Sequence, residues 1–297
     1  MKGHRAWRRI AAGMAVLCSV AAGLTVLTAA GGQTILYSRG QNIAPAFEGW
    51  EANPDGTFSL WFGYMNRNMD EKLHIPVGPH NRLDPEPLDG GQPTWFHPRR
   101  NRYVFRVVVP ADFGDREVVW SVTAHGKTDS AYGSLRLDYV VDKLMKMMDI
   151  GGVGVQQAEL DNVAPVVRVQ GARERSVRVG EPLALQAFAS DDGIPSRLPA
   201  MRWPPVKHNA WGLRVSWYVF RGDGDQVSFE PEQVKVYPDY RGNSPWTPGW
   251  MPPLPPDDGL FPVTATFREP GTYVLRVMAH DGGSISNEQV TVNVTAP

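Results

Sequence analysis

The feature that most constrains this chain is a series of short alternating segments in its last third. Leu213–Phe220, Val263–Phe267 and Thr272–His280 place apolar side chains at about every second position. Because successive side chains of a strand point to opposite faces, this period of two predicts strands with one buried face. Gly222-Asp-Gly224 and Pro270-Gly271 lie between the segments, and these residue types favour tight turns. The pattern predicts a sandwich of antiparallel strands.

The first 30 residues predict a signal peptide. Four basic residues open the chain: Lys2, Arg5, Arg8 and Arg9. An uncharged apolar run follows at 10–27, and Thr28-Ala-Ala30 supplies the small residues that a signal peptidase accepts. We expect cleavage after Ala30, with Gly32 as the alternative site, and export to the periplasm or the extracellular space. The alternative is an uncleaved anchor, because the run approaches the ~20 apolar residues that a membrane span needs.

Composition limits the partners of the exported part. The whole chain has 30 Lys and Arg against 31 Asp and Glu, so loss of the four basic signal residues leaves a net charge of about −5. A mildly acidic chain without a basic cluster argues against nucleic acid or an anionic membrane as partner. The single cysteine, Cys18, lies inside the predicted signal. Each domain must therefore be stabilised by its apolar core without disulfides.

Residues 34–142 are predicted to form a first β-sandwich. Its candidate strands are 46–51, 57–66, 103–109, 117–124 and 134–141. Asn53-Pro-Asp-Gly56 predicts a tight hairpin between the first two strands, because Asp-Gly tolerates the positive φ that such turns need. The stretch 75–100 is rich in Pro, Gly, Asp and His, which predicts a long loop.

Residues 143–163 are predicted to connect two domains. Leu144 and the neighbouring methionines favour a short helix over 142–150, and Gly151-Gly-Val-Gly154 would end it. The thioethers of Met145, Met147 and Met148 could bind Cu(I), for which soft sulfur is selective. Methionine is also the ordinary filler of a docking helix, and no His or Cys nearby supports copper.

Residues 164–297 predict a second sandwich. Its candidate strands are 165–169, 177–179, 182–189, 213–220, 263–267, 272–280 and 289–295. Two long insertions, 194–212 and 230–259, interrupt it. The second insertion contains the Pro-rich run Trp246–Pro256, where the prolines fix φ and remove backbone donors. That run predicts a stiff surface loop.

The second half also resembles a known family. The segments that carry the resemblance are Val179–Leu185, Asp191–Gly193, Val215–Trp217, Gly222–Gly224, Pro270–Tyr273 and Ala279–Asp281. In PKD-type and related bacterial immunoglobulin-like domains, a Gly opens the second strand, a Trp is buried at mid-domain and Gly-x-Tyr precedes the penultimate strand. The resemblance covers about 164–297, departs in the two insertions, and implies a fold without implying a function.

The fold class predicted is therefore all-β. We expect two immunoglobulin-like β-sandwich domains in tandem after an N-terminal signal segment, with one short helix in the connector. No family is assigned to 34–142.

Acidic-glycine turns recur in the second domain and suggest calcium. Calcium takes six to eight oxygen ligands, which carboxylates at one end of a sandwich could supply. The candidate ligands are Asp191, Asp192, Asp223 and Asp281. The alternative is that Asp-Gly is the ordinary composition of a tight turn. No EF-hand spacing is present. We therefore predict no cofactor, with calcium at these aspartates as the alternative.

Aromatic residues concentrate in the insertions and suggest a ligand surface. The candidate binding residues are Trp203, Trp211, Tyr237, Tyr240, Trp246 and Trp250. Aromatic faces on loops can stack on sugar rings. The alternative is that the insertions fold back and bury these rings, because indoles usually bury most of their area. Trp217, on a predicted core strand, is assigned to packing.

Catalytic patterns are absent from the sequence. His74, His80 and His97 accompany Asp84, Glu86 and Asp89 in the first domain, but no His-x-His or His-Glu-x-x-His spacing links them. Ser244 lacks the Gly-x-Ser-x-Gly elbow of hydrolases. No catalytic residue is predicted.

The function predicted is that of an exported, non-catalytic recognition or structural module. Its partner would be a protein or polysaccharide of the cell envelope or beyond, bound through the insertions of the second domain. One alternative is a secreted hydrolase or its carbohydrate-binding accessory, with a pocket formed by His74–Asp89. A second alternative is a calcium-stiffened spacer. The sequence does not determine the oligomeric state.

Overall fold

The computed structural model describes residues 36–85, 87, 89–150, 160–200 and 209–297. Tyr37–Pro297 form one compact unit. The predicted signal, the Gly151–Gly154 turn and Trp203 lie outside the described residues. Within the described ranges, no helix has the length and apolar character needed to cross a membrane. The secondary structure is almost entirely β, as predicted.

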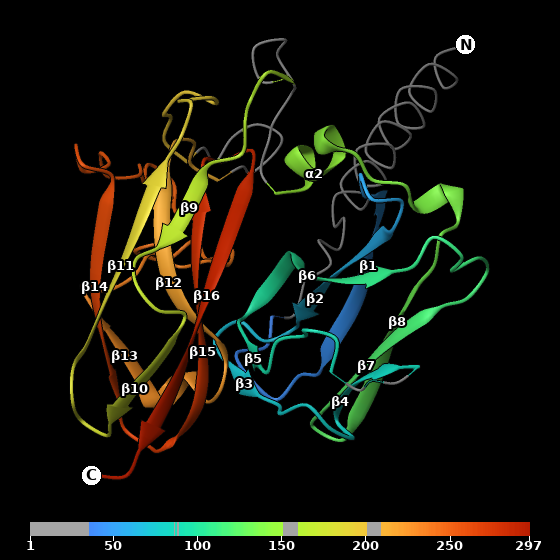
Figure 1. Cartoon of the computed structure of the whole chain (residues 1–297), viewed down its shortest axis with the longest axis horizontal. Coiled ribbons are helices and arrows are strands. Elements are labelled where there is room, and N and C mark those ends of the chain that lie inside the picture. Colours follow the sequence, from blue (N-terminus) through green and yellow to red (C-terminus); the bar gives the residue numbers. More distant parts are fainter. Residues whose placement is uncertain (1–35, 86, 88, 151–159, 201–208) are drawn as a thin grey trace, which may run out of the picture. The chain divides into compact units, whose positions relative to one another are not determined.

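Two three-stranded antiparallel sheets build the first sandwich (Figure 1). One has the order β1 (Ile43–Ala52), β2 (Phe58–Asn66), β6 (Arg99–Val109). The other has the order β4 (Asn81–Asp84), β7 (Val118–Ala124), β8 (Lys127–Gly133). A small sheet pairs β3 (Leu73–His74) with β5 (Trp95–Phe96). In chain order the two larger sheets correspond to the A-B-E and C-F-G strands of an immunoglobulin-like sandwich.

Aromatic rings fill the core of the first sandwich. Trp120 is fully buried and lies 4.8 Å from Phe105 and 6.2 Å from Phe62, measured between ring centroids. Its indole Nε1 donates a 3.0 Å hydrogen bond to Oδ1 of buried Asn81. The predicted turn at 53–56 is confirmed, because Gly56 adopts φ +83° and its N–H donates to the Asn53 carbonyl.

Two predictions for the first sandwich are wrong. The stretch 75–100 is not one long loop, because it contains β4 and the start of β6. The polar residue Asn81 occupies a buried position of β4, so apolar alternation could not reveal that strand. The last strand is β8, not 134–141. A tight turn at His125 (φ +50°) and Gly126 (φ +73°) joins it to β7, and its mostly polar residues gave no periodic signal.

The predicted strand 134–141 instead contains the short 3₁₀ helix η1 (Leu137–Tyr139). The connector helix is confirmed as α2 (Lys143–Ile150). Asp142 caps it, since its Oδ1 accepts a 2.7 Å hydrogen bond from the Met145 N–H. Met147 is buried whereas Met145 and Met148 are exposed, so the three thioethers do not share one environment.

Two four-stranded sheets build the second sandwich (Figure 1). One has the order β13 (Val227–Glu230), β14 (Leu260–Phe267), β11 (Leu183–Ser190), β9 (Val166–Val169). The other has the order β10 (Glu174–Arg178), β16 (Ile285–Thr295), β15 (Gly271–His280), β12 (Arg214–Arg221). A 3₁₀ helix, η2 (Gly224–Gln226), links β12 to β13. These are the A-B-E-D and C-F-G sheets of an immunoglobulin fold, with β10 added parallel to β16.

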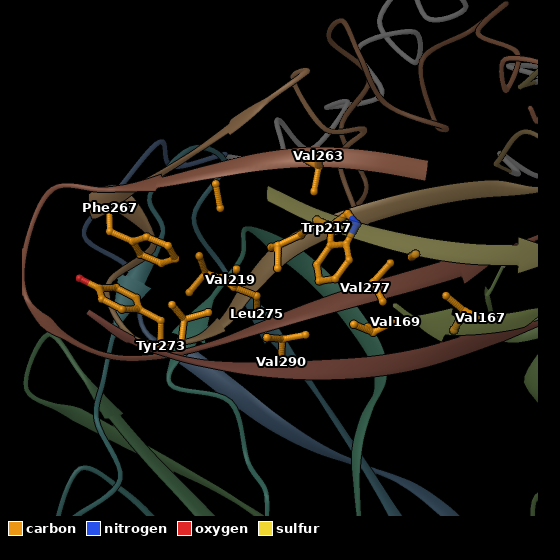
Figure 2. Close-up of a cluster of buried hydrophobic side chains, with 14 of the residues drawn as sticks. Val167, Val169, Trp217, Val219, Val263, Phe267, Tyr273, Leu275, Val277 and Val290 are labelled. Atoms are coloured by element: carbon orange, nitrogen blue, oxygen red, sulfur yellow. The ribbon is translucent and has the colours of Figure 1, made fainter. Parts of the chain in front are cut away.

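The core of the second sandwich has two hallmarks of that fold (Figure 2). Trp217 on β12 is buried between the sheets, as predicted. The hydroxyl of Tyr273, near the start of β15, donates a 3.1 Å hydrogen bond to the Glu269 carbonyl, which is a tyrosine corner. Leu275 stands two residues further on, where antibody domains carry a disulfide cysteine, and packs in the same core. The fold is thus immunoglobulin-like and free of disulfides.

Candidate functional site between the two sandwiches

The two sandwiches are joined along the edge strand β12. The Thr94 N–H donates a 3.1 Å hydrogen bond to the Phe220 carbonyl, as a neighbouring strand would. The Arg221 guanidinium donates to the Gln92 carbonyl at 2.8 Å and pairs with Asp89 at 2.6 Å. The first sandwich therefore satisfies backbone groups of an edge that would otherwise be open.

Side chains are exchanged across this junction. Trp95, on β5, is buried in the core of the second sandwich, and Phe220, on β12, is buried in the core of the first. Gly224 allows the approach of Trp95, since a Cβ at that position would lie 2.5 Å from the indole. Further along, Arg276 Nη1 donates a 2.6 Å hydrogen bond to the Val104 carbonyl. Each core therefore contains one large aromatic ring that comes from the other half of the chain.

A cavity of about 270 Å³ lies beside the junction and has walls from both sandwiches. Its lining includes Arg102, Tyr103 and Asp149 from the first half of the chain and Tyr218, Arg276 and Asn287 from the second. Tyr103 and Asn287 also line an adjoining pocket beneath α2, where Lys146 lies 4.5 Å from the centre of the Trp61 ring.

The wall formed by the first sandwich has an irregular backbone. The β1–β2 register shifts between Phe47 and Gly49, so Glu48 is a bulge residue. Arg99 and Tyr103 on β6 adopt φ +68° and φ +49°, and His125 in a hairpin turn is the other non-glycine residue with positive φ in the described ranges. Bulges and strained non-glycine residues concentrate at functional sites. This backbone geometry marks the Arg99–Tyr103 segment as a candidate functional site.

A network of charged side chains covers the same wall. Arg100 Nη2 lies 2.6 Å from Oε2 of Glu48, whose side chain is only 3% exposed. Burial raises the pKa of the Glu48 carboxyl, and the Arg100 guanidinium opposes that rise. Arg102 Nη1 lies 3.7 Å from Glu48 and 3.4 Å from Asp149, and Tyr103 donates a 2.8 Å hydrogen bond to Asp149. Burial and Asp149 raise the Tyr103 pKa.

Two buried groups at the cavity are unusual. Burial lowers the pKa of His97 to about 3, so its ring is neutral, and both ring nitrogens are buried. Tyr237 stacks on this ring with centroids 5.4 Å apart. Arg276 is 7% exposed and lies 3.4 Å above the centre of the Phe220 ring. In the described part of the chain, no carboxylate pairs with Arg276.

The structure separates the aromatic residues predicted to bind ligand. Tyr237 is buried against His97, Trp211, Trp246 and Trp250 are half-buried, and Tyr240 is exposed. The two insertions pair with each other, since the Ala200 N–H donates to the Trp250 carbonyl and the Gly249 N–H to the Ala200 carbonyl. The second insertion also reaches the first sandwich, where Arg241 pairs with Asp70 at 2.7 Å. The binding role of these residues stays a prediction.

The four predicted calcium ligands do not come together. The β12–β15 register pairs Arg214 with His280 and Arg221 with Val274, so Asp223 and Asp281 follow opposite ends of these strands. Asp191 and Asp192 lie at the end near Asp281 and accept hydrogen bonds from the N–H groups of Gly193 and Ile194. Within the described ranges, no cluster of three or more His, Cys, Asp or Glu could hold a metal ion.

The pocket expected of a hydrolase is not seen at the described residues of the His74–Asp89 segment. The described cavities are not lined by His74, His80, Asp84 or Asp89. Asp89 is occupied by Arg221, which holds its pKa below the ordinary value. Glu86 lies outside the described residues.

Sequence reasoning missed the Arg99–Tyr103 wall. The available signal was Arg99-Arg-Asn-Arg-Tyr103, three arginines in five residues at the entry to a predicted strand. Arg276 was also missed, although it is a charged residue within an otherwise apolar strand.

No protein-family model and no curated protein matches the chain. Among solved structures, the chain is similar to the titin M10–obscurin-like 1 Ig complex at 14% identity and a TM-score of 0.25, covering 46% of this chain and 98% of that one. It is similar to the adhesin InvE of Yersinia pseudotuberculosis at 12% identity and a TM-score of 0.23, covering 89% and 62%. Domains 4 and 5 of the S-layer protein SbsC give 12% identity, a TM-score of 0.23, and coverage of 61% and 66%. At these values the likeness assigns no function, and the immunoglobulin-like fold rests on the strand order described above.

Proposed function

We propose that this protein is an exported, non-catalytic recognition module that holds a ligand between its two sandwiches. The observation that supports the proposal is the cavity with walls from both sandwiches, next to the strained Arg99–Tyr103 segment. Because the junction buries Trp95 and Phe220, the two walls are held in a fixed relation. Such preorganisation reduces the entropy lost on binding. Export rests on the signal predicted at 1–30.

Recognition is favoured over catalysis because the carboxylates on the wall of the first sandwich already have partners within the protein. Glu48 is almost completely covered and paired with Arg100, and Tyr103 is bonded to Asp149. General acid–base catalysis needs a group within hydrogen-bond reach of the substrate. The ring nitrogens of His97 are buried, so a ligand in the cavity cannot reach them as the side chains now lie.

The experiment blocks the mouth of the cavity. Asn287 is exposed, lies on β16 and lines the cavity, so Asn287→Trp should fill the entrance without disturbing either core. Asn293→Trp is the matched control. Asn293 is an exposed residue on the same strand, where that strand pairs with β10, and it does not line the cavity. Binding of the mature protein would be measured against a panel of neutral glycans, acidic glycans and peptides.

We expect at least one panel member to bind the wild type and Asn293→Trp, and to lose at least tenfold in affinity with Asn287→Trp. Ligands that bind all three proteins equally would contradict the proposal. That result would direct attention back to the loop aromatics Trp246 and Trp250. A panel with no ligand at all would favour a structural role for the paired sandwiches.

A further inference from the structure

We infer that the cavity takes an acidic sugar residue, a single hydroxylated ring carrying one anionic group, and that Arg276 and Arg102 recognise the anion. This inference rests on the proposed function and names the ligand class of the same cavity. Three features support it: a buried cation without a counter-charge among the described residues, polar groups without a side-chain partner there, and a volume that suits one ring.

Arg276 supplies the first argument. A buried charge is normally paired with an opposite charge, because its desolvation is costly. Arg276 is 7% exposed, yet its partners among the described residues are neutral: the Val104 carbonyl, the side-chain amide of Gln289 and the face of Phe220. Its guanidinium has five N–H donors, and these contacts leave some of them unused. A bound anion would supply the missing counter-charge.

The charges around the cavity lead to the same conclusion. Asp149 is the only carboxylate on the described lining, whereas Arg100, Arg102 and Arg276 all contribute to it. Glu48 balances Arg100 and Asp149 balances Arg102, which leaves Arg276 in excess. The Arg102 contacts are 3.4 and 3.7 Å long and its side chain is 36% exposed, so its donors remain open to a ligand. Arginine suits carboxylate and phosphate groups because its planar fork can bind both oxygens.

The rest of the lining suits a hydroxylated ring. The Tyr218 hydroxyl and the Asn287 amide line the cavity and have no side-chain hydrogen bond within the described residues. They can exchange hydrogen bonds with sugar hydroxyls, while Tyr103 offers aromatic surface for the apolar face of a ring. At about 270 Å³, the cavity is just below the ~300–1,000 Å³ of pockets for drug-sized ligands, a volume that suits one sugar ring.

The first test varies the ligand and keeps the protein unchanged. Calorimetric titrations would compare galacturonate and glucuronate with their methyl esters, with galactose and glucose, and with the corresponding 6-phosphates. The methyl ester keeps the shape of the acid and removes its charge, so it isolates the role of the anion. We expect the acid to bind at least tenfold more tightly than its ester, and its affinity to fall as salt is raised. The 6-phosphates distinguish a preference for phosphate from one for carboxylate.

The second test varies the protein. Arg276→Gln and Arg102→Gln should each weaken the acid at least tenfold and leave the ester unchanged, with Asn293→Trp as the control. If Arg276→Gln fails to fold, the ligand series on the wild type and Arg102→Gln still decides the question. If only neutral sugars or only acidic peptides bind, and Asn287→Trp blocks that binding, this inference is overturned. The proposed function would still stand in that case. If no ligand is blocked by Asn287→Trp, the proposed function itself fails.

Discussion

Trp95 and Phe220 exchange places between the two sandwiches. Trp95 belongs to a strand of the first sandwich and is 4% exposed within the core of the second. Phe220 belongs to β12 of the second sandwich and is 3% exposed within the core of the first. Each ring therefore completes a core that its own sheet does not build. Separation of the sandwiches would expose two large aromatic surfaces at once, so their stabilities are coupled.

We expect Trp95→Ala and Phe220→Ala each to lower the free energy of unfolding by ~3–5 kcal/mol, the usual loss for a truncated core aromatic. The wild type should unfold in one transition. Urea denaturation, followed by circular dichroism and by tryptophan fluorescence, would measure the free energy of unfolding and show the number of transitions. Tyr132→Ala, at a residue 58% exposed, is the control and should change stability by less than ~0.5 kcal/mol. Two well-separated transitions in the wild type would contradict the coupling.

The tyrosine corner makes a smaller and separable contribution. Tyr273→Phe removes the hydroxyl that bonds the Glu269 carbonyl and keeps the ring in the core. We expect the free energy of unfolding to fall by ~0.5–1.5 kcal/mol, the net value of one hydrogen bond. Thermal melting would show a loss of a few degrees, and Tyr132→Phe should show none. An unchanged melting temperature would mean that a hydrogen bond to water replaces this one with no loss of stability.

Most of the second sandwich could be predicted because its strands alternate. The segments that became β11, β12, β14 and β15 each carry apolar residues on one face, and their predicted limits differ from the structure by three residues or fewer. β13 was missed because it is a half-exposed edge strand of four residues. β4 and β8 were missed for a related reason, since their buried positions are held by residues such as Asn81 and Gly133.

The candidate site could not be predicted from local sequence. Its walls join residues about 170 positions apart, as in the contact from Arg276 to Val104, |i−j| = 172. The exchange of Trp95 and Phe220 depends on how two folded sandwiches meet, and no periodic pattern encodes that contact. The loop aromatics were conspicuous in sequence, but Tyr237 is buried and packs against His97. The sequence signal for this site was the presence of arginines within strands.

Stability should depend on pH through Asp281. Burial raises the pKa of this carboxyl to about 6 from the ordinary 3.8, against hydrogen bonds from the Ser284 and Gly283 N–H groups. The folded state therefore binds a proton more tightly than the unfolded state. The stabilising effect is complete below pH ~4 and is lost as pH rises through about 6. Near this carboxyl, burial keeps His280 neutral and Arg214 remains charged, with its pKa lowered to about 9.

The measurement is the difference in unfolding free energy between the wild type and Asp281→Asn from pH 7 to pH 5. Glu48 also has a raised pKa and acts in the same direction, so only the difference isolates Asp281. We expect the wild type to gain about 1 kcal/mol relative to Asp281→Asn as pH falls from 7 to 5. A difference that does not vary with pH would show that Asp281 keeps an ordinary pKa.

Calcium should leave the melting temperature unchanged. Asp223 and Asp281 follow opposite ends of β12 and β15, which the paired register separates by roughly 20 Å at ~3.3 Å per residue. The oxygens of Asp192 already accept hydrogen bonds from the Val163 and Ile194 N–H groups, as turn carboxylates do. A functional site at ~100 times its dissociation constant would add about 2.7 kcal/mol. Thermal melts with millimolar calcium and with EDTA would measure this. A rise that Asp192→Ala abolishes and Asp223→Ala does not would restore a calcium site at the Asp281 end.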